Sequence, residues 1–219
     1  METKVQFQKN AAVLAADGED VGSLDRVVLV PETKAVTHIV VRKGTLLNKV
    51  DRVVPINLVA DTTEDQIVLR TEAGDLESFP PFEEEHFVEE KGDLDKPPSA
   101  ESTSPSTFGF PEVDPPFLAV PGEKFISEVE QNIPEGTVAL KEGAKVITAE
   151  GKHVGNVERV LAEPSVVDQV THLLISTGML LKKTKLIPIQ WVAKMSENEV
   201  QLRVEADSVE KLADVSIAG

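Results

Sequence analysis

The chain of 219 residues contains the same pattern twice, and this repeat constrains its fold more than any other feature. Residues 11–70 align with residues 144–203 at a spacing of 133 to 134. The matched positions include Gly18 with Gly151, Val21-Gly22 with Val154-Gly155, Arg26-Val27 with Arg159-Val160, Val36-Thr37-His38 with Val170-Thr171-His172, Pro55-Ile56 with Pro188-Ile189, and Leu69-Arg70 with Leu202-Arg203. A domain as small as one copy buries little surface and is only marginally stable alone. We therefore predict two small domains, residues 1–78 and 137–219, joined by a connector over residues 79–136.

The net charge of −16 belongs almost entirely to the middle of the chain. Residues 71–136 carry 17 acidic and 3 basic side chains, whereas the flanking parts, 1–70 and 137–219, are nearly neutral. Because contact with phosphates needs clustered Lys and Arg, nucleic acid is not the expected partner. The absence of Cys excludes disulfides and thiolate metal sites. No stretch has the length of apolar sequence that a membrane span or a signal sequence needs, so we expect a cytoplasmic protein without an integral membrane segment.

Each copy has the pattern of strands separated by turns. Enrichment in β-branched residues, with turn signals about every 8–12 residues, predicts a small all-β sandwich or barrel. The expected strands are 11–16, 21–30, 36–42, 52–60 with an interruption at Pro55, and 66–70 in the first copy, and 144–149, 154–162, 169–176, 185–194 and 199–204 in the second. Gly22 and Gly155 fall inside strands, where a bulge or a close barrel corner is the usual reason for glycine. Asp207-Ser208 predicts one short helix over residues 209–214, and residues 75–79 predict a matching helical turn in the first copy.

Alternation along these strands predicts the core of each copy. The expected core residues are Val13, Val21, Val27, Leu29, Ile39, Val41, Val54, Ile56, Ile67 and Leu69 in the first copy, and Val146, Val154, Val160, Leu173, Ile175, Ile187, Ile189, Val200 and Leu202 in the second.

The connector combines two properties that rarely occur together. It holds 10 of the 14 prolines, and residues 95–107 have the composition of a disordered linker. It also holds seven of the eight Phe, including Phe79, Phe82, Phe108 and Phe110, although solvated linkers lack aromatic residues. Two interpretations stay open: these rings cover the sheets of the chain's own domains, or some of them anchor another protein.

Both copies resemble the PRC-barrel domain, the β-barrel shared by the cytoplasmic part of the photosynthetic reaction-centre H subunit and the C-terminal half of a ribosome-maturation factor. The resemblance rests on the Gly18 turn with Val21-Gly22, on the strand 36–41, on the basic segment that begins at Gly44, on Val53-Val54-Pro55, and on their counterparts in the second copy. It implies two compact barrels of about six strands each that act by binding proteins. Because both halves are PRC-like, the chain is similar to soluble bacterial proteins with tandem PRC barrels.

Catalytic and metal-binding patterns are not found in the sequence. No Gly-rich phosphate loop, nucleophile elbow or zinc spacing occurs, and the carboxylates of the connector lie where no rigid, dry pocket is expected. His38 and His172 occupy one repeat position in β-branched strands, without a second ligand two or four residues away, so we interpret them as structural. We predict no catalytic residues, no metal and no cofactor.

Basic residues gather in both copies around the loop that leads to the Pro-containing strand, which in the first copy is expected over residues 43–51 with Gly44 at its start. We predict that they project from one corner of each barrel and bind an acidic surface, for which the connector glutamates 83–85 and 89–90 are the nearest source; the alternative is that they only provide solubility. Trp191 aligns with Leu58 and is expected to be a surface-packing anchor. The candidate partner-binding residues are Arg42, Lys43, Lys49, Arg52, Lys182, Lys183, Lys185, Phe108, Phe110 and Trp191.

Taken as a sequence, the chain is therefore expected to be a non-enzymatic adaptor or scaffold that binds a protein partner. The two copies pair within one chain or form a homodimer through equivalent faces. Two other functions stay open: a ribosome- or RNA-maturation factor, and a peripheral subunit of a membrane or photosynthetic complex.

Overall fold

The computed structural model describes residues 5–45, 48–63, 65–70, 75–89, 125–163, 166–178 and 183–215. The chain divides into two units, the first made of Met1–Glu83 with Gln131–Gly219 and the second of Glu84–Glu130. The all-β prediction is confirmed, and the short helix α1, Ala206–Glu210, lies near the C-terminus as expected. It begins earlier than the expected 209–214, because Glu205 and not Asp207 is the residue before its first turn.

The first repeat forms one sheet with the strand order β5-β4-β3-β2-β7-β6. Neighbouring strands are antiparallel except β2 and β7, which are parallel. Pro55 ends β5 and precedes a 3-10 turn, η1, as expected from a residue that cannot donate to the ladder. The elements are β2 Ala12–Leu14, β3 Asp20–Leu29, β4 Val36–Thr45, β5 Asn48–Pro55, η1 Ile56–Leu58, β6 Val59–Thr62, β7 Gln66–Leu69 and η3 Leu76–Ser78.

The second repeat forms an equivalent sheet with the order β14-β13-β12-β11-β16-β15. Its single parallel pair, β11 with β16, matches β2 with β7. The elements are β11 Lys145–Ile147, β12 His153–Glu163, β13 Val166–Thr177, β14 Lys183–Pro188, η4 Ile189–Trp191, β15 Val192–Met195 and β16 Glu199–Leu202.

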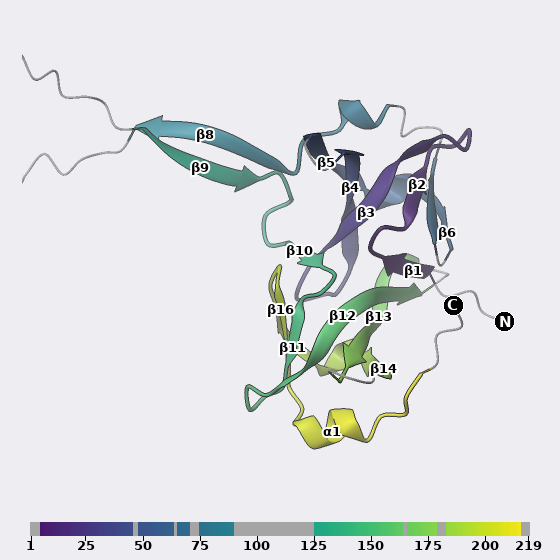
Figure 1. Ribbon diagram of the computed structural model, residues 1–219, viewed down its shortest axis with the longest axis vertical. Coiled ribbons are helices and arrows are strands. Elements are labelled where there is room, and N and C mark those ends of the chain that lie inside the picture. The colour runs from purple at the N-terminus through teal and green to yellow at the C-terminus, as the bar shows by residue number, and fades with distance from the viewer. Residues whose placement is uncertain are drawn as a thin grey trace, which may run out of the picture. The chain divides into compact units, whose positions relative to one another are not determined.

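Each repeat also contributes one strand to the sheet of the other repeat (Figure 1). Strand β1, Val5–Gln8, pairs antiparallel with β12, and strand β10, Val138–Lys141, pairs antiparallel with β3. The two registers are equivalent, since Val5 lies opposite Ala162 and Val138 lies opposite Leu29. The sequence did not predict these two strands, which begin before the aligned blocks. Their reciprocal exchange ties the repeats together through backbone hydrogen bonds.

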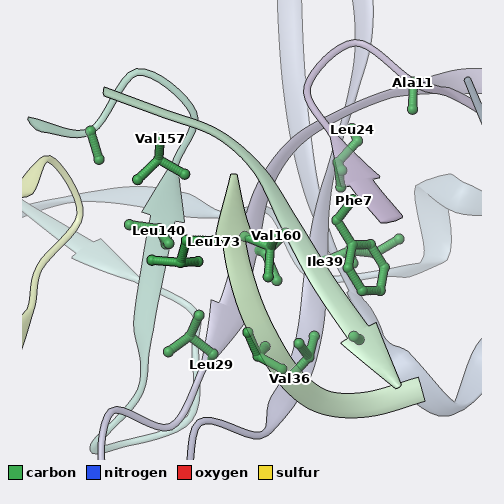
Figure 2. Close-up of a cluster of buried hydrophobic side chains, with 14 of the residues drawn as sticks. Phe7, Ala11, Leu24, Leu29, Val36, Ile39, Leu140, Val157, Val160 and Leu173 are labelled. Atoms are coloured by element: carbon green, nitrogen blue, oxygen red, sulfur yellow. The ribbon is translucent and has the colours of Figure 1, made fainter. Parts of the chain in front are cut away.

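The repeats share one hydrophobic core, to which both sheets and both exchanged strands contribute. Figure 2 shows its side chains, with Phe7 and Ile39 on one side, Leu140 and Leu173 on the other, and Val160 between them. The predicted core residues are buried, apart from four that are only half-buried at its margin: Val21, Ile56, Val154 and Ile189. The predicted core is therefore confirmed, and the structure adds a second, smaller cluster around Val28, Val40 and Phe82.

Two glycines permit neighbouring strands to approach closely. A Cβ atom at Gly22 would lie 2.5 Å from the carbonyl oxygen of Arg42, and one at Gly155 would lie 2.2 Å from that of Ser176. The register of β2 on β3 also shifts beside Gly22, between Val13 and Leu14. The expected bulge is confirmed beside both glycines, and the structure adds the close approach of the backbones as the reason that each position requires glycine.

The closed form of the expected barrels is not found among the described residues. Strands β5 and β6 are the two ends of the first sheet, and β14 and β15 are the two ends of the second. The free edge of β5 is instead covered by the start of the connector: the amide of Val53 donates to the carbonyl of Pro80, and the amide of Phe82 donates to that of Asp51. Backbone pairing outside the repeat thus takes the place of barrel closure.

The connector contains regular structure at both of its described ends. Strands β8, Glu83–Glu89, and β9, Phe125–Gln131, pair with each other as a two-stranded sheet. The sequence predicted no strands here. The expected disordered stretch, 95–107, lies outside the described residues.

Candidate binding site

The basic segment of the first repeat is a long β-hairpin and not the loop that the sequence predicted over 43–51. Strands β4 and β5 pair without a register shift from His38 opposite Pro55 to Thr45 opposite Asn48. Since side chains alternate along a strand and directly opposed residues share a face, Arg42 and Asp51 lie on one face and Lys43 and Val50 on the other. The four predicted basic residues are therefore divided, with Arg42 and Lys49 on the first face and Lys43 and Arg52 on the second.

On the first face, Arg42 belongs to a cluster of charges. Its Nε and Nη2 atoms each lie 2.8 Å from a carboxylate oxygen of Asp51, and its Nη1 lies 2.7 Å from Asp25 Oδ1. Asp25 is almost fully buried and also contacts Arg26 at 3.0 Å. The hydrogen bonds to Asp51 are the main cause that raises the pKa of the Arg42 guanidinium above its ordinary value. The charge of Arg42 is thus paired with Asp51 and Asp25 of its own repeat.

This cluster extends to the second repeat and to the connector. Arg26 Nη1 lies 2.5 Å from Glu197 Oε1, and the guanidinium carbon of Arg26 stands 4.5 Å from the centre of the Phe82 ring. Phe82 is 1% exposed and packs with Val28 and Val40. Phe79 is half-buried against the shared core. For Phe79 and Phe82, the prediction that rings of the connector cover the chain's own sheets is therefore confirmed.

On the second face, the hairpin and the turn η3 enclose a pocket of about 350 Å³. Leu76 is buried in the core, whereas Val50 is 37% exposed. Lys43 Nζ lies 3.4 Å from Glu77 Oε1, and both of these side chains are exposed. The residues that line the pocket are Lys43, Gly44, Val50, Arg52, Leu76 and Glu77.

Arg52 joins the pocket to the connector. Its Nη1 donates to the carbonyl oxygen of Phe79 at 2.9 Å, at the end of η3. Its Nε is buried and has no hydrogen-bond partner among the described residues. Because a guanidinium carries five N–H donors, Arg52 retains donors for a further acceptor.

The equivalent residue of the second repeat, Lys185, has its charge taken up within the chain. Its Nζ donates to the carbonyl oxygens of Glu210 at 3.2 Å and Leu212 at 2.5 Å, and lies 3.1 Å from Asp214 Oδ1. The backbone bridge between Lys185 and Asp214 matches that between Arg52 and Pro81. In both repeats a basic residue at this position therefore holds the segment that follows the sheet. Of the two, Arg52 has an N–H without a partner among the described residues, whereas the Lys185 amine does not.

The other predicted residues are placed as follows. Lys183 is exposed, and its Nζ lies 2.7 Å from Asp214 Oδ2. The hydrogen bond with Lys183, and to a lesser extent that with Lys185, lowers the pKa of Asp214 below its ordinary value. Trp191 is half-buried against the shared core, as expected for a packing anchor. Lys182, Phe108 and Phe110 lie outside the described residues.

Sequence reasoning missed the charged cluster, although the repeat contains a signal for it. Arg42 and Asp51 pair in the first repeat, whereas the aligned residues of the second are Ser176 and Thr184. A pair of opposite charges that is lost jointly from one copy indicates contact between its members. Glu197 could not be found in this way, because its contact with Arg26 crosses between the repeats.

A second cavity, at the contact between the repeats, has a volume of only about 10 Å³. At its edge the amide of Lys9 donates to Glu142 Oε2 at 2.6 Å. Burial raises the pKa of the Glu142 carboxyl, although the Lys9 amide opposes this shift. The cavity has room for about one water molecule, so its role is confined to packing.

The histidine positions show no sign of a metal centre in the described part of the chain, where no three His, Cys, Asp or Glu side chains are grouped for an ion. His38 lies opposite Pro55 in the β4–β5 ladder, and burial lowers the pKa of its imidazole. Its Nδ1 is buried and has no hydrogen-bond partner among the described residues.

Comparison with protein families finds one similarity. Residues 140–210 match a family described as "Uncharacterized protein conserved in bacteria (DUF2171)". This segment runs from β10 to α1 and covers most of the second repeat. The search of curated proteins found no match. No helix in the described residues is long and apolar enough to cross a membrane.

Proposed function

We propose that this chain is a non-enzymatic adaptor of the cytoplasm that binds a protein partner through the hairpin pocket of its first repeat. The pocket is the surface lined by Lys43, Gly44, Val50, Arg52, Leu76 and Glu77. The second repeat, in this proposal, supports the first through the shared core and the exchanged strands.

The observation that carries the proposal is the difference between the two repeats at one equivalent place. Arg52 borders a pocket and has a buried N–H without a partner among the described residues, whereas the Lys185 amine has three oxygen atoms around it. Two cations beside an exposed valine make a surface suited to recognition, since charge sets orientation and apolar contact supplies affinity. The resemblance to PRC-barrel domains supports a protein as the partner.

Site-specific photo-crosslinking tests this function. Val50 is replaced by the photoreactive benzoylphenylalanine in the full chain, and the equivalent exposed position of the second repeat, Lys183, is replaced in a control chain. On irradiation of cells that express each chain, we expect discrete protein adducts from position 50 that are absent from position 183. Adducts at position 50 should also weaken when Lys43→Glu is added.

Two results would contradict the proposal. One is that position 50 forms no adduct although the chain is folded, as judged by its circular dichroism. The other is that positions 50 and 183 form the same adducts, which would show that the pocket of the first repeat has no special role.

A further inference from the structure

We propose that the hairpin pocket binds an extended acidic peptide segment in which a carboxylate side chain stands next to an aliphatic one. This inference rests on the proposed function and specifies the chemistry of the partner. Its three grounds are the size of the pocket, the arrangement of charge around it and the apolar surface between the charges.

The size of the pocket fits a few side chains. A volume of about 350 Å³ lies at the lower end of the range of ligand sites, which is about 300–1,000 Å³. The pocket is formed by one face of a hairpin and the turn η3, so a chain that runs along the hairpin can place alternate side chains into it.

The charges of the pocket favour a carboxylate. Lys43 and Arg52 line it together with a single acid, Glu77. The Arg52 guanidinium lines the pocket and is oriented by the bond from its Nη1 to the Phe79 carbonyl, which leaves N–H groups of the guanidinium for a further acceptor. A planar guanidinium that is already held in place is well suited to bind a carboxylate, since its N–H groups match the two oxygen atoms.

Glu77, the ion-pair partner of the Lys43 amine, is easily displaced. Lys43 and Glu77 are both largely exposed, with 47% and 68% of their side chains accessible, and ion pairs of this kind contribute little. A partner carboxylate that also contacts Arg52 can therefore take the place of Glu77.

The pocket also offers an apolar side chain beside its two cations. Val50 follows the strand alternation onto the same face as Arg52 and is directly opposite Lys43. Val50 lines the pocket together with Leu76, which is almost fully buried. An aliphatic side chain next to the bound carboxylate would cover Val50, which is why we infer an acidic-aliphatic segment and not an acidic run alone.

Fluorescence anisotropy with a defined peptide tests the inference on the full chain. The probe is a fluorescein-labelled peptide of sequence Gly-Ser-Glu-Val-Glu-Val-Ser-Gly. Two matched peptides carry Gln in place of Glu or Ser in place of Val. We expect the probe to bind more tightly than both, and its affinity to fall with added salt because exposed charges are screened.

Variants locate the binding on the protein. Lys43→Gln should weaken binding of the probe on the order of fivefold, the effect of one exposed ion pair. Val50→Asp should weaken it about tenfold or more, because it removes the apolar contact and adds a repelling charge. Both positions are exposed at the hairpin, so folding should be retained. The control Lys183→Gln removes one exposed charge from the second repeat and should leave binding unchanged.

Several outcomes would overturn the inference. They are equal affinity for the Gln peptide, equal weakening by Lys183→Gln, and tighter binding of a single-stranded RNA of similar length than of the probe. The crosslinking result separates the two proposals. Adducts at position 50 without peptide binding would reject the acidic-aliphatic specificity and leave the adaptor function standing, whereas absence of both would reject both.

Discussion

Phe7 of the first repeat lies opposite Val160 of the second, in the ladder between β1 and β12. Only 2% of Phe7 is exposed, and its ring belongs to the core that both repeats share. The side chain that stabilises one sheet is thus carried by a strand of the other repeat. This arrangement makes the two repeats a single folding unit.

We expect Phe7→Ala to destabilise both repeats together, by about 3–5 kcal/mol, because it removes a buried ring from the shared core. Trp191 is the single Trp and reports on the second repeat. Urea unfolding followed by its fluorescence and by circular dichroism should show one coincident transition at a lower midpoint. The equivalent variant Leu140→Ala is the matched comparison and should cost about 2–5 kcal/mol. A fluorescence midpoint unchanged by Phe7→Ala would contradict the shared core.

Gly22→Ala should destabilise the protein by at least about 2 kcal/mol. The added Cβ would meet the Arg42 carbonyl oxygen at 2.5 Å, and backbone atoms cannot give way without moving β4. Gly18→Ala is the control, since its Cβ would have no atom within 4 Å and its cost is limited to the positive φ of +89°, about 1 kcal/mol. Urea midpoints of the two variants give the comparison, and equal shifts would argue against the close approach.

Lys185→Met should cost about 1–3 kcal/mol, because the carbonyl oxygens of Glu210 and Leu212 lose their donor. Amide hydrogen exchange in α1 should become faster, while exchange in β3 stays unchanged. Lys183→Met is the control, because Lys183 is 59% exposed, and it should change stability by less than about 0.5 kcal/mol. An unchanged exchange rate in α1 would show that the Lys185 contacts do not hold the helix.

Phe82→Ala should release the start of the connector from the first sheet. The ring is buried beneath Arg26, and its loss should cost about 3–5 kcal/mol. A Glu-specific protease should then cleave at Glu83 under native conditions sooner than in the unmodified chain. Phe79→Ala, at a half-buried ring, should have the smaller effect. Equal protection of Glu83 in all three chains would contradict this account.

His38 should make the protein less stable as the pH falls. Burial lowers the pKa of His38 in the folded state below its ordinary value of 6.5, so the unfolded chain binds the proton more readily. The contribution of His38 is therefore complete above about pH 6.5 and is lost progressively as the pH falls toward the folded pKa. Urea unfolding at a series of pH values should show this loss, and His38→Gln should reduce the slope. An imidazole NMR titration with a midpoint at or above 6.5 would contradict the burial effect.

Much of the fold follows from local pattern. The predicted strands 36–42 and 169–176 placed Ile39, Val41, Leu173 and Ile175 correctly in the interior. Val40 is buried as well, because Phe82 of the connector covers the other face of the sheet there. The helical turn η3 was predicted over residues 75–79 from its match with the C-terminal helix of the second copy, and in the structure the Asp75 side chain accepts a hydrogen bond from the Glu77 amide at 3.0 Å.

The candidate site could be predicted only in part from the local sequence pattern. Lys43 and Arg52 were singled out as basic residues, but treating 43–51 as a loop hid the alternation that separates them from Arg42 and Lys49. Leu76 and Glu77 could not be assigned to the site, because the turn η3 reaches the hairpin only in the folded chain.

The sequence by itself determined two copies of an all-β unit, their core residues and the glycines at the bulges inside their strands. These properties depend on neighbours in the chain, which repeat and alternation reveal. Only the tertiary structure decided that β1 and β10 exchange between the repeats. Strands of four residues, Val5–Gln8 and Val138–Lys141, contain no local signal that distinguishes pairing with their own repeat from pairing with the other. That choice depends on contacts between residues more than 100 positions apart, as between Phe7 and Val160.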